Sequence, residues 1–104
     1  MKLWIDDERL APEGYVWCFS VEAAKTWIKS AEFDKHAFSG EGVELIDIDH
    51  DAGHYACDGG DYIKLLDWLE ETGRNYPIRI HSANPVGVEN MRRIIERNGW
   101  KEIR

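Results

Sequence analysis

The stretch VELIDIDHD, residues 43–51, decides the fold of this chain. It begins with apolar side chains and ends in three consecutive ionisable ones, Asp49, His50 and Asp51. An apolar run of this length is typical of a strand that crosses a protein interior. The sequence therefore predicts a central strand over residues 43–49 that delivers ionisable side chains at its carboxyl end.

Two other segments have the same construction. Residues 3–9, LWIDDER, pass from apolar to acidic side chains, and residues 78–84, IRIHSAN, pass from apolar to polar ones. A further strand is predicted over residues 15–19, where aromatic and β-branched side chains dominate. The strand that contains Ile78 is expected to span residues 77–82, and residues 101–104 are compatible with a short additional strand at an edge.

Helical signals lie between the predicted strands. Ser20 is a suitable N-cap for the first helix, and Asn84-Pro85 are typical of a helix start. Pro12 and Gly14 exclude a helix of useful length between the first two strands. The three predicted helices begin at residue 21, at residue 60 or 61, and at residue 85. The first ends between residues 32 and 38, before a stop at residues 39–42. The second ends at residue 73 and the third at residue 99.

Strands that alternate with helices predict an α/β fold with a parallel sheet and right-handed crossovers. The length of 104 residues fits one domain, residues 1–104. All carboxyl ends of a parallel sheet lie on one edge, and ligands bind outside that edge. We therefore expect Asp6 and Asp7, residues 49–51 and residues 81–84 to lie close together.

The composition excludes some functions. A net charge of −7 argues against non-specific binding of nucleic acid through its phosphates, although it leaves room for a small phosphorylated or nucleotide-like ligand. Two cysteines without a CxxC pair indicate free thiols in a reducing compartment. Neither a signal peptide nor a membrane span is recognisable, so we expect a soluble, cytoplasmic protein. The sequence does not indicate a protein partner.

A metal site is the first chemical prediction. Asp6, Asp7 and Asp49, with Asp51 as a further candidate, would bring several carboxylates into one small volume. Their repulsion is relieved by protonation or by a cation, and hard oxygen ligands suit Mg²⁺ or Mn²⁺. The plainer alternative is that the aspartates cap turns at the strand ends.

Histidines beside these positions suggest proton transfer. His50 and His81 can each exchange a proton near neutral pH, as general acid–base catalysis requires, and Asp49 is a catalytic candidate beside them. Asp51 could orient His50 or complete the metal shell. Neighbouring residues of a strand point in opposite directions, however, and a histidine bonded to the backbone is the commoner arrangement. His54 is a weaker candidate in the following loop, and His36 is expected at the surface.

Phosphate contacts are expected where the third helix begins. The free N–H groups and the dipole of a helix start favour an anion, so Ser82 and Asn84 are candidate ligands, although Asn84 would cap the helix in any case. Arg9 could clamp a phosphate or form a surface ion pair. Asp47 requires a buried partner that the sequence does not identify. The large apolar rings of Trp4, Trp27 and Trp68 are expected in the core.

The motifs resemble the receiver domains of response regulators. In that family an acidic pair holds a divalent metal, a central aspartate accepts a phosphoryl group, and a Ser/Thr-Ala step contacts its oxygens. Asp6 and Asp7, Asp49, and Ser82-Ala83 match these positions. The resemblance implies a flavodoxin-like three-layer fold with strand order 2-1-3-4 and room for a fifth strand. The first receiver helix is reduced to a loop here, and the usual Lys-Pro after the fifth strand is absent.

A closer resemblance is to the cyclic-phosphate processing receiver domains. It rests on residues 4–9 (WIDDER), 49–51 (DHD) and 81–87 (HSANPVG) and on their spacing. That family is predicted to act on cyclic phosphates in RNA repair or nucleotide signalling. The resemblance implies metal-assisted hydrolysis or transfer of a small cyclic phosphate. Two alternatives stay open: a non-catalytic module that binds phosphate, nucleotide or protein, and a signalling domain phosphorylated on Asp49, which the missing lysine weakens.

Overall fold

A computed structural model describes residues 1–34 and 42–104. Its centre is a five-stranded, fully parallel sheet with the order β2-β1-β3-β4-β5. The predicted receiver-like order is confirmed, and the additional edge strand forms. The strands are β1 (Lys2–Ile5), β2 (Tyr15–Cys18), β3 (Leu45–Ile48), β4 (Ile78–Ile80) and β5 (Glu102–Ile103).

The helices begin and end close to the predicted residues. Ser20 caps the first by accepting the N–H of Ala23, and Gly99, with φ +67°, ends the last. A 3₁₀ helix in the loop after β3 was not predicted. His36, which was predicted at the surface, lies outside the described residues. The predicted helix stop at residues 39–42 lies outside them too, except for residue 42. The elements are α1 (Val21–Asp34), η1 (Gly53–Cys57), α2 (Ile63–Glu71) and α3 (Pro85–Asn98).

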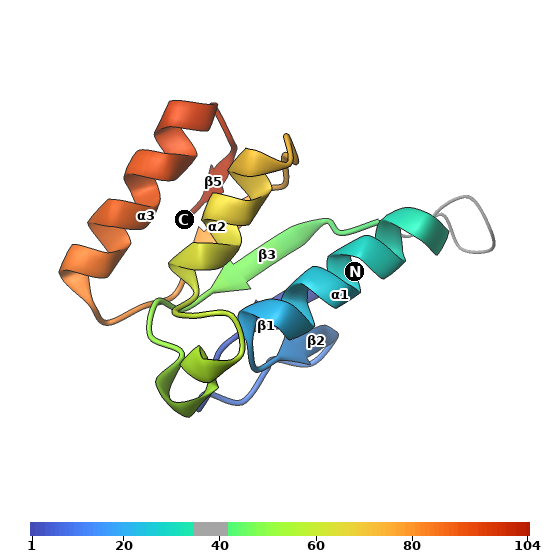
Figure 1. Cartoon of the computed structure of the whole chain (residues 1–104), viewed down its shortest axis with the longest axis horizontal. Helices are drawn as coiled ribbons and strands as arrows, with labels where there is room; N and C mark the ends of the chain where they lie inside the picture. The colour runs from blue at the N-terminus through green and yellow to red at the C-terminus, as the bar shows by residue number, and fades with distance from the viewer. Residues whose placement is uncertain (35–41) are drawn as a thin grey trace.

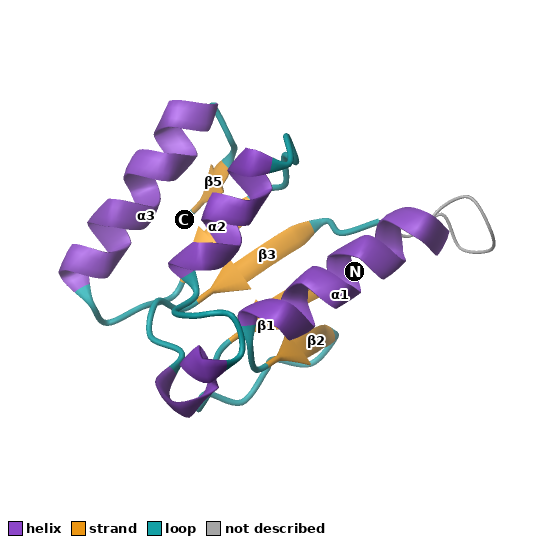
Figure 2. Cartoon of the chain, in the orientation of Figure 1, coloured by secondary structure: helices purple, strands orange, loops and turns teal. Residues whose placement is uncertain are grey.

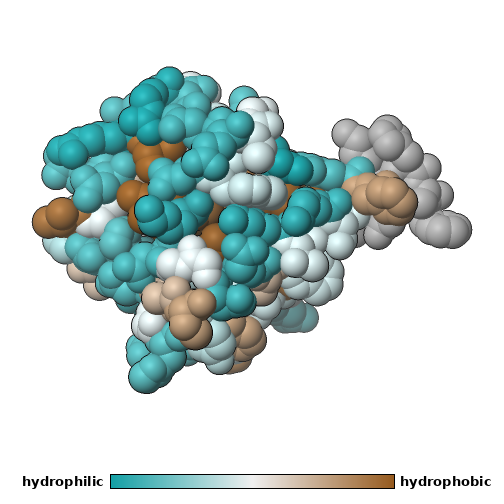
Figure 3. Space-filling model, in the orientation of Figure 1, coloured by the Kyte–Doolittle hydropathy of each residue, from teal (hydrophilic) through white to brown (hydrophobic). Residues whose placement is uncertain are grey.

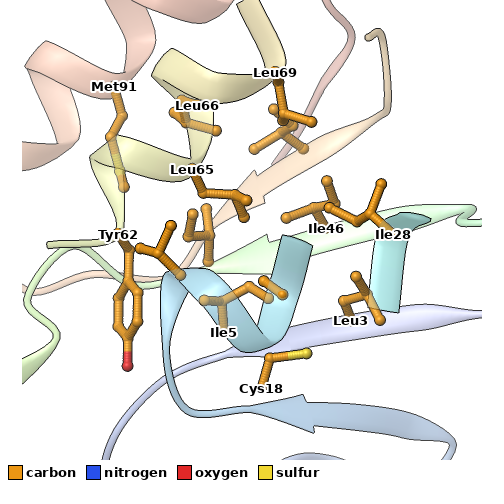
Figure 4. Packing of buried hydrophobic residues seen from close by; sticks show 14 of the residues in the cluster. Leu3, Ile5, Cys18, Ile28, Ile46, Tyr62, Leu65, Leu66, Leu69 and Met91 are labelled. Atoms are coloured by element: carbon orange, nitrogen blue, oxygen red, sulfur yellow. The ribbon is translucent and has the colours of Figure 1, made fainter. Parts of the chain in front are cut away.

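All three α-helices cover the same face of the sheet. The connections from β2 to β3, β3 to β4 and β4 to β5 move in one direction across the sheet, and right-handed crossovers in one direction share a face. Figures 1 and 2 show α1, α2 and α3 on the near side of the strands. The buried cluster agrees, because it joins the helices to alternate strand residues such as Leu3, Ile5 and Ile46 (Figure 4). Ile48 belongs to the same cluster.

The opposite face carries the connection between β1 and β2, residues 6–14, because this crossover runs in the other direction. Two indole groups hold it: Trp4 Nε1 donates to the carbonyl of Arg9 (2.9 Å), and Trp17 Nε1 donates to the carbonyl of Asp6 (2.8 Å). No helix of the described residues covers this face. The receiver-like α/β fold therefore has helices on one face, rather than on both as a three-layer arrangement requires.

The tryptophans divide between several environments. Trp4 is buried but lies on the face away from the helices, and Trp68 is partly buried against the core. The prediction that Trp27 lies in the core is wrong, since its side chain is 43% exposed. The buried stripe of α1 runs through Ala24 and Ile28, and successive helical residues are rotated by about 100°. Trp27 therefore lies at the flank of the buried stripe, where its side chain is only half covered.

The outer surface of the helical layer is mostly hydrophilic, and apolar atoms show mainly in the furrows between helices (Figure 3). The α-helices are short and amphipathic. None of those in the described parts of the chain has the length and apolar character needed to cross a membrane.

Candidate functional site

Three carboxylates meet at the carboxyl edge of the sheet. Asp6 and Asp7 follow β1, and Asp49 follows the neighbouring strand β3. One oxygen from each residue lies within 4.8 Å of the others. Hard carboxylate oxygens at this spacing are suited to a divalent cation such as Mg²⁺. The three residues predicted as metal ligands could therefore bind a metal ion together.

Asp6 is the most firmly held of the three. Its side chain is buried, and its Oδ1 accepts the N–H groups of Glu8 (2.9 Å) and Arg9 (3.0 Å). Its Oδ2 lies 2.8 Å from Nε2 of His81. Burial alone would raise the pKa of Asp6, but the hydrogen bonds from Glu8, Arg9 and His81 outweigh burial and lower it. Asp6 is therefore a fixed, ionised carboxylate.

Asp7 is less well compensated. Its pKa is raised, first by burial and then by the negative charges of Glu8, Asp6 and Asp49. Gly53 packs directly against it, because a Cβ built on Gly53 would lie 2.5 Å from Asp7 Oδ2. The φ of +56° at Gly53 also favours glycine. A bound cation would remove the repulsion that raises the pKa of Asp7.

His81 bridges two buried carboxylates. Its Nδ1 lies 2.6 Å from Oδ1 of Asp47, and its Nε2 contacts Asp6. The ring stacks on Trp4, with centroids 3.7 Å apart and planes 4° apart. Each ring nitrogen of His81 therefore has its own carboxylate partner. Arg79 adds a contact to Asp47 at 3.3 Å. These contacts supply the partner that Asp47 requires.

His50 points away from the acidic cluster. Its Nδ1 lies 2.9 Å from Oδ1 of Asp51 and 3.5 Å from Nδ2 of Asn84. Its ring packs on Gly87 in the first turn of α3, where an added Cβ would lie 2.5 Å from the ring. Asp49 faces the other way, toward Asp7 and Asp6. Just beyond the end of β3, the side chains of Asp49 and His50 thus turn to different sides.

A pocket of about 380 Å³ lies beside the cluster. The carboxylates of Asp7 and Asp49 form one side, and the start of α3 forms the other. Asn84 caps α3 through a hydrogen bond from Gly87 N–H to its Oδ1 (3.0 Å). The pocket therefore combines negative charge with a helix start that favours an anion. It is lined by Asp7, Glu8, Arg9, Asp49, Asp51, Gly53, Ser82, Ala83 and Asn84.

The predicted site residues take different places around this pocket. Six of them line it: Asp7, Arg9, Asp49, Asp51, Ser82 and Asn84. Asp6 and His81 lie in the layer behind the lining, and His50 lies beside it against α3. His54 is exposed in η1 and is not among the lining residues; its carbonyl accepts the thiol of Cys57 at 3.1 Å.

Sequence reasoning missed several contributors. Glu8 and Gly53 line the pocket, and Trp4 supports the ring of His81. Glu8 could have been found, because it directly follows the acidic pair. Gly53 could not, because only the folded loop brings it against Asp7. The arginine lining the pocket, Arg9, is anchored by a 3.0 Å hydrogen bond from Nη1 to the carbonyl of His81.

One of three comparisons with known proteins gave a match. A family model described as "Cyclic-phosphate processing Receiver domain" matches residues 1–97. This range includes every residue of the pocket lining and of the acidic cluster. No curated protein and no solved structure matches the chain.

Proposed function

Because the chain belongs to the cyclic-phosphate processing receiver domain family, we propose that it is a metal-assisted phosphoesterase that opens a small cyclic phosphate. The observation that carries this proposal is a cluster of three carboxylates within 4.8 Å, two of which line a pocket that also reaches Asn84, the N-cap of α3. The carboxylates suit a cation, and the helix start suits an anion. A phosphate is the ligand that would satisfy both.

Asp6, Asp7 and Asp49 would hold the metal ion, with Mg²⁺ or Mn²⁺ as the best match for an all-oxygen site. When bound, the ion would neutralise the carboxylates and draw electron density from the phosphoryl oxygens. His81 serves this site as a positioning residue. Both of its ring nitrogens are engaged by carboxylates, so it fixes Asp6 rather than exchanging a proton with the substrate.

The phosphate would lie against Ser82, Ala83 and the first turn of α3. Ser82 has a hydroxyl at the pocket surface, and its Oγ already accepts the N–H of Asn84 at 3.1 Å. The hydroxyl hydrogen remains available to donate to a phosphate oxygen. Arg9 contributes the positive side chain of the lining, and one of its guanidinium nitrogens is fixed on the His81 carbonyl.

The pair formed by Asp51 and His50 is the best candidate for the proton carrier. Asp51 is 64% exposed and lines the pocket, while His50 holds its Oδ1 at 2.9 Å. In hydrolysis, a water oxygen bonds to phosphorus and one ring P–O bond breaks. The proton of the water passes to the Asp51–His50 pair, and the departing alkoxide takes a proton from solvent. The pair then returns its proton to solvent, and the product is a phosphomonoester.

Incubation with 2′,3′-cyclic nucleotides and ADP-ribose cyclic phosphates, followed by ³¹P NMR, tests the proposal. We expect conversion to a phosphomonoester with Mg²⁺ or Mn²⁺, no conversion with EDTA, and none in Asp49→Asn. Asp51→Asn should lower the rate by about 10²–10⁴-fold, the usual contribution of general acid–base catalysis. Asp67→Asn, on the outer side of α2, is the matched control and should retain the wild-type rate.

Two results would contradict hydrolysis. Chemical-shift changes at the pocket without any turnover would indicate a binding module. Stable phosphorylation by acetyl phosphate that is lost in Asp49→Asn would indicate a signalling domain.

A further inference from the structure

Three aromatic side chains form a row beside the acidic cluster. The ring of Trp17 stacks on Phe19 at a centroid distance of 4.7 Å, and Phe19 lies 5.4 Å from the ring of Tyr55. Phe19 is 38% exposed and Tyr55 is 42% exposed. The proton chemistry and the metal ligands of the proposed reaction use none of the three. The exposed parts of Phe19 and Tyr55 need a different explanation.

Hydrogen bonds fix this row against the acidic cluster. Trp17 donates its indole N–H to the carbonyl of Asp6, and the buried hydroxyl of Tyr62 donates to the carbonyl of Phe19 (2.7 Å). In Figure 4 the Tyr62 hydroxyl points away from the aliphatic side chains of the core. The pKa of Tyr62 is raised, by burial first and then by the negative charges of Asp7, Asp6 and Asp49.

The third ring is fixed to the pocket through η1. Tyr55 stands two residues after Gly53, which lines the pocket and touches Asp7. The N–H of Tyr55 donates to the carbonyl of Ala52 at 3.0 Å, at the start of the same 3₁₀ turn. Tyr55 therefore belongs to the same 3₁₀ turn as Gly53, the residue of that turn that lines the pocket.

The order of strands sets the distance between the rings and the phosphate position. Along the sheet edge, Phe19 follows β2, Asp6 follows β1, Asp49 follows β3 and Ser82 follows β4. Neighbouring strands are about 4.8 Å apart, so the β2 and β3 ends are separated by about 10 Å. A ligand that reaches from the Asp49 end of the phosphate site can lay a second group on Phe19 and Tyr55 if it is as long as a nucleotide.

We propose that Phe19 and Tyr55 form a platform for a nucleobase, which makes the substrate a nucleoside cyclic phosphate rather than a cyclic phosphate without a base. This inference rests on the function proposed above and specifies its substrate class. Exposed aromatic rings stack on bases of any sequence, because every base has a π face. Trp17 supports the platform from behind, since it stacks on Phe19 and is anchored on the Asp6 carbonyl.

A pair of ligands that differ only in the base tests the platform. Adenosine 2′,3′-cyclic phosphate is compared with methyl riboside 2′,3′-cyclic phosphate in the presence of Mg²⁺. Affinity is measured as the dissociation constant by calorimetry, or as KM where the ligand is turned over. We expect the wild-type protein to bind the adenosine ligand about tenfold more tightly, in line with the contribution of one stacked base.

Substitutions then identify the side chains that cause the tighter binding of the adenosine ligand. Phe19→Leu and Tyr55→Leu should each remove most of the tenfold difference and leave the affinity for the methyl riboside unchanged. Tyr55→Trp should retain or increase it. Phe33→Leu is the matched control, because Phe33 is an exposed ring (85%) on α1, away from the row. If Phe19→Leu fails to fold, Tyr55→Leu in the exposed 3₁₀ turn carries the test alone.

The outcomes separate this inference from the proposed function. Equal affinity of the wild type for both ligands would overturn the platform and leave the phosphate site intact. A loss of affinity for both ligands in Tyr55→Leu would also overturn it, because the side chain would then act on the phosphate site. Binding of neither ligand by the wild type would overturn the phosphate site itself and the platform with it.

Discussion

The Nδ1 atom of His81 lies 2.6 Å from Oδ1 of Asp47, a carboxylate in the middle of β3 that has no exposed surface. An unpaired charge at such a position would be strongly destabilising. The pairing with His81 compensates it, and the other ring nitrogen of His81 reaches Asp6. A central strand is thereby connected to the acidic cluster through one imidazole ring.

Removal of Asp47 should therefore reduce the stability of the whole domain. Asp47→Ala leaves Arg79 and the Nδ1 atom of His81 without their carboxylate, and loss of one partner from a buried ionic group costs about 3–5 kcal/mol. Urea-induced equilibrium unfolding measures the change. Asp67→Asn is the control: its contact with Lys64 spans 3.9 Å at the surface, and we expect a change within about 0.5 kcal/mol. Equal stability of Asp47→Ala and the wild type would contradict the bridging role of His81.

Gly87 should tolerate no larger side chain. The Cβ of an alanine would lie 2.5 Å from the ring of His50, so the ring must move away from α3 and from Asp51. We expect Gly87→Ala to cost about 1–3 kcal/mol, as overpacking does, and to shift the ring resonances of His50 in NMR spectra. Gly42→Ala is a suitable comparison, because nothing lies within 4 Å of its Cβ position. Unchanged His50 resonances in Gly87→Ala would show that the ring is not held there.

The meeting of the strand ends could be predicted because it depends on few variables. Each apolar run stops at an ionisable residue, and parallel strands must present these ends on one edge. Asp6, Asp7 and Asp49 follow β1 and β3, which are neighbours in the sheet. Once the strands were recognised, only their order was needed to bring these carboxylates together.

The orientation of side chains at those ends could not be predicted, since it depends on register. Asp47 pairs with Arg79 across β3 and β4, so His81 is two residues further along the same face. That offset lets the ring of His81 reach back to Asp47, although the sequence alone suggested that it faced a substrate. The prediction for Trp27 was wrong for a related reason, because one residue along a helix separates a buried side chain from an exposed one.

The two cysteines should differ sharply in reactivity. Cys18 is 1% exposed at the end of β2, and burial raises the pKa of its thiol to about 12. Cys57 is exposed in η1. Since the thiolate is the reactive form, a thiol reagent should label the native protein rapidly at one cysteine and label the second only after denaturation. Native Cys57→Ser should show no rapid phase; a rapid phase in that variant would mean that β2 opens readily.

Metal binding should appear as a gain in thermal stability. A cation that binds only the folded state stabilises it by about 2.7 kcal/mol at a concentration one hundred times its Kd. We expect Mg²⁺ or Mn²⁺ to raise the Tm of the wild type, and we expect Asp49→Asn to abolish the rise. Ser82→Ala should retain it, because Ser82 lines the pocket but does not belong to the acidic cluster. A metal-dependent rise that persists in Asp49→Asn would place the cation elsewhere.

Without a metal, Asp7 should make the protein less stable as the pH rises. Its pKa in the folded state is raised by burial and by neighbouring negative charges, so its stabilising contribution is complete below the unfolded-state pKa, about 3.9. That contribution is lost as the pH rises through the higher pKa of the folded state. Asp7→Asn should therefore be more stable than the wild type at pH 7 in EDTA, and the difference should shrink toward pH 4.

Asp6 belongs to the same acidic cluster, but its contribution to stability should change with pH in the opposite direction to that of Asp7. Its pKa is lowered because hydrogen bonds from Glu8, Arg9 and His81 outweigh burial, so its contribution is present above the unfolded-state pKa and is lost in acid. Asp6→Asn should therefore be less stable than the wild type at pH 7, where Asp7→Asn is more stable. Urea unfolding midpoints between pH 4 and pH 7, measured in EDTA and again with Mg²⁺, test whether each variant is more or less stable than the wild type. With the ion bound, the advantage of Asp7→Asn should reverse, because the variant lacks a ligand. A less stable Asp7→Asn in EDTA at pH 7 would mean that the three carboxylates do not repel one another in the folded protein.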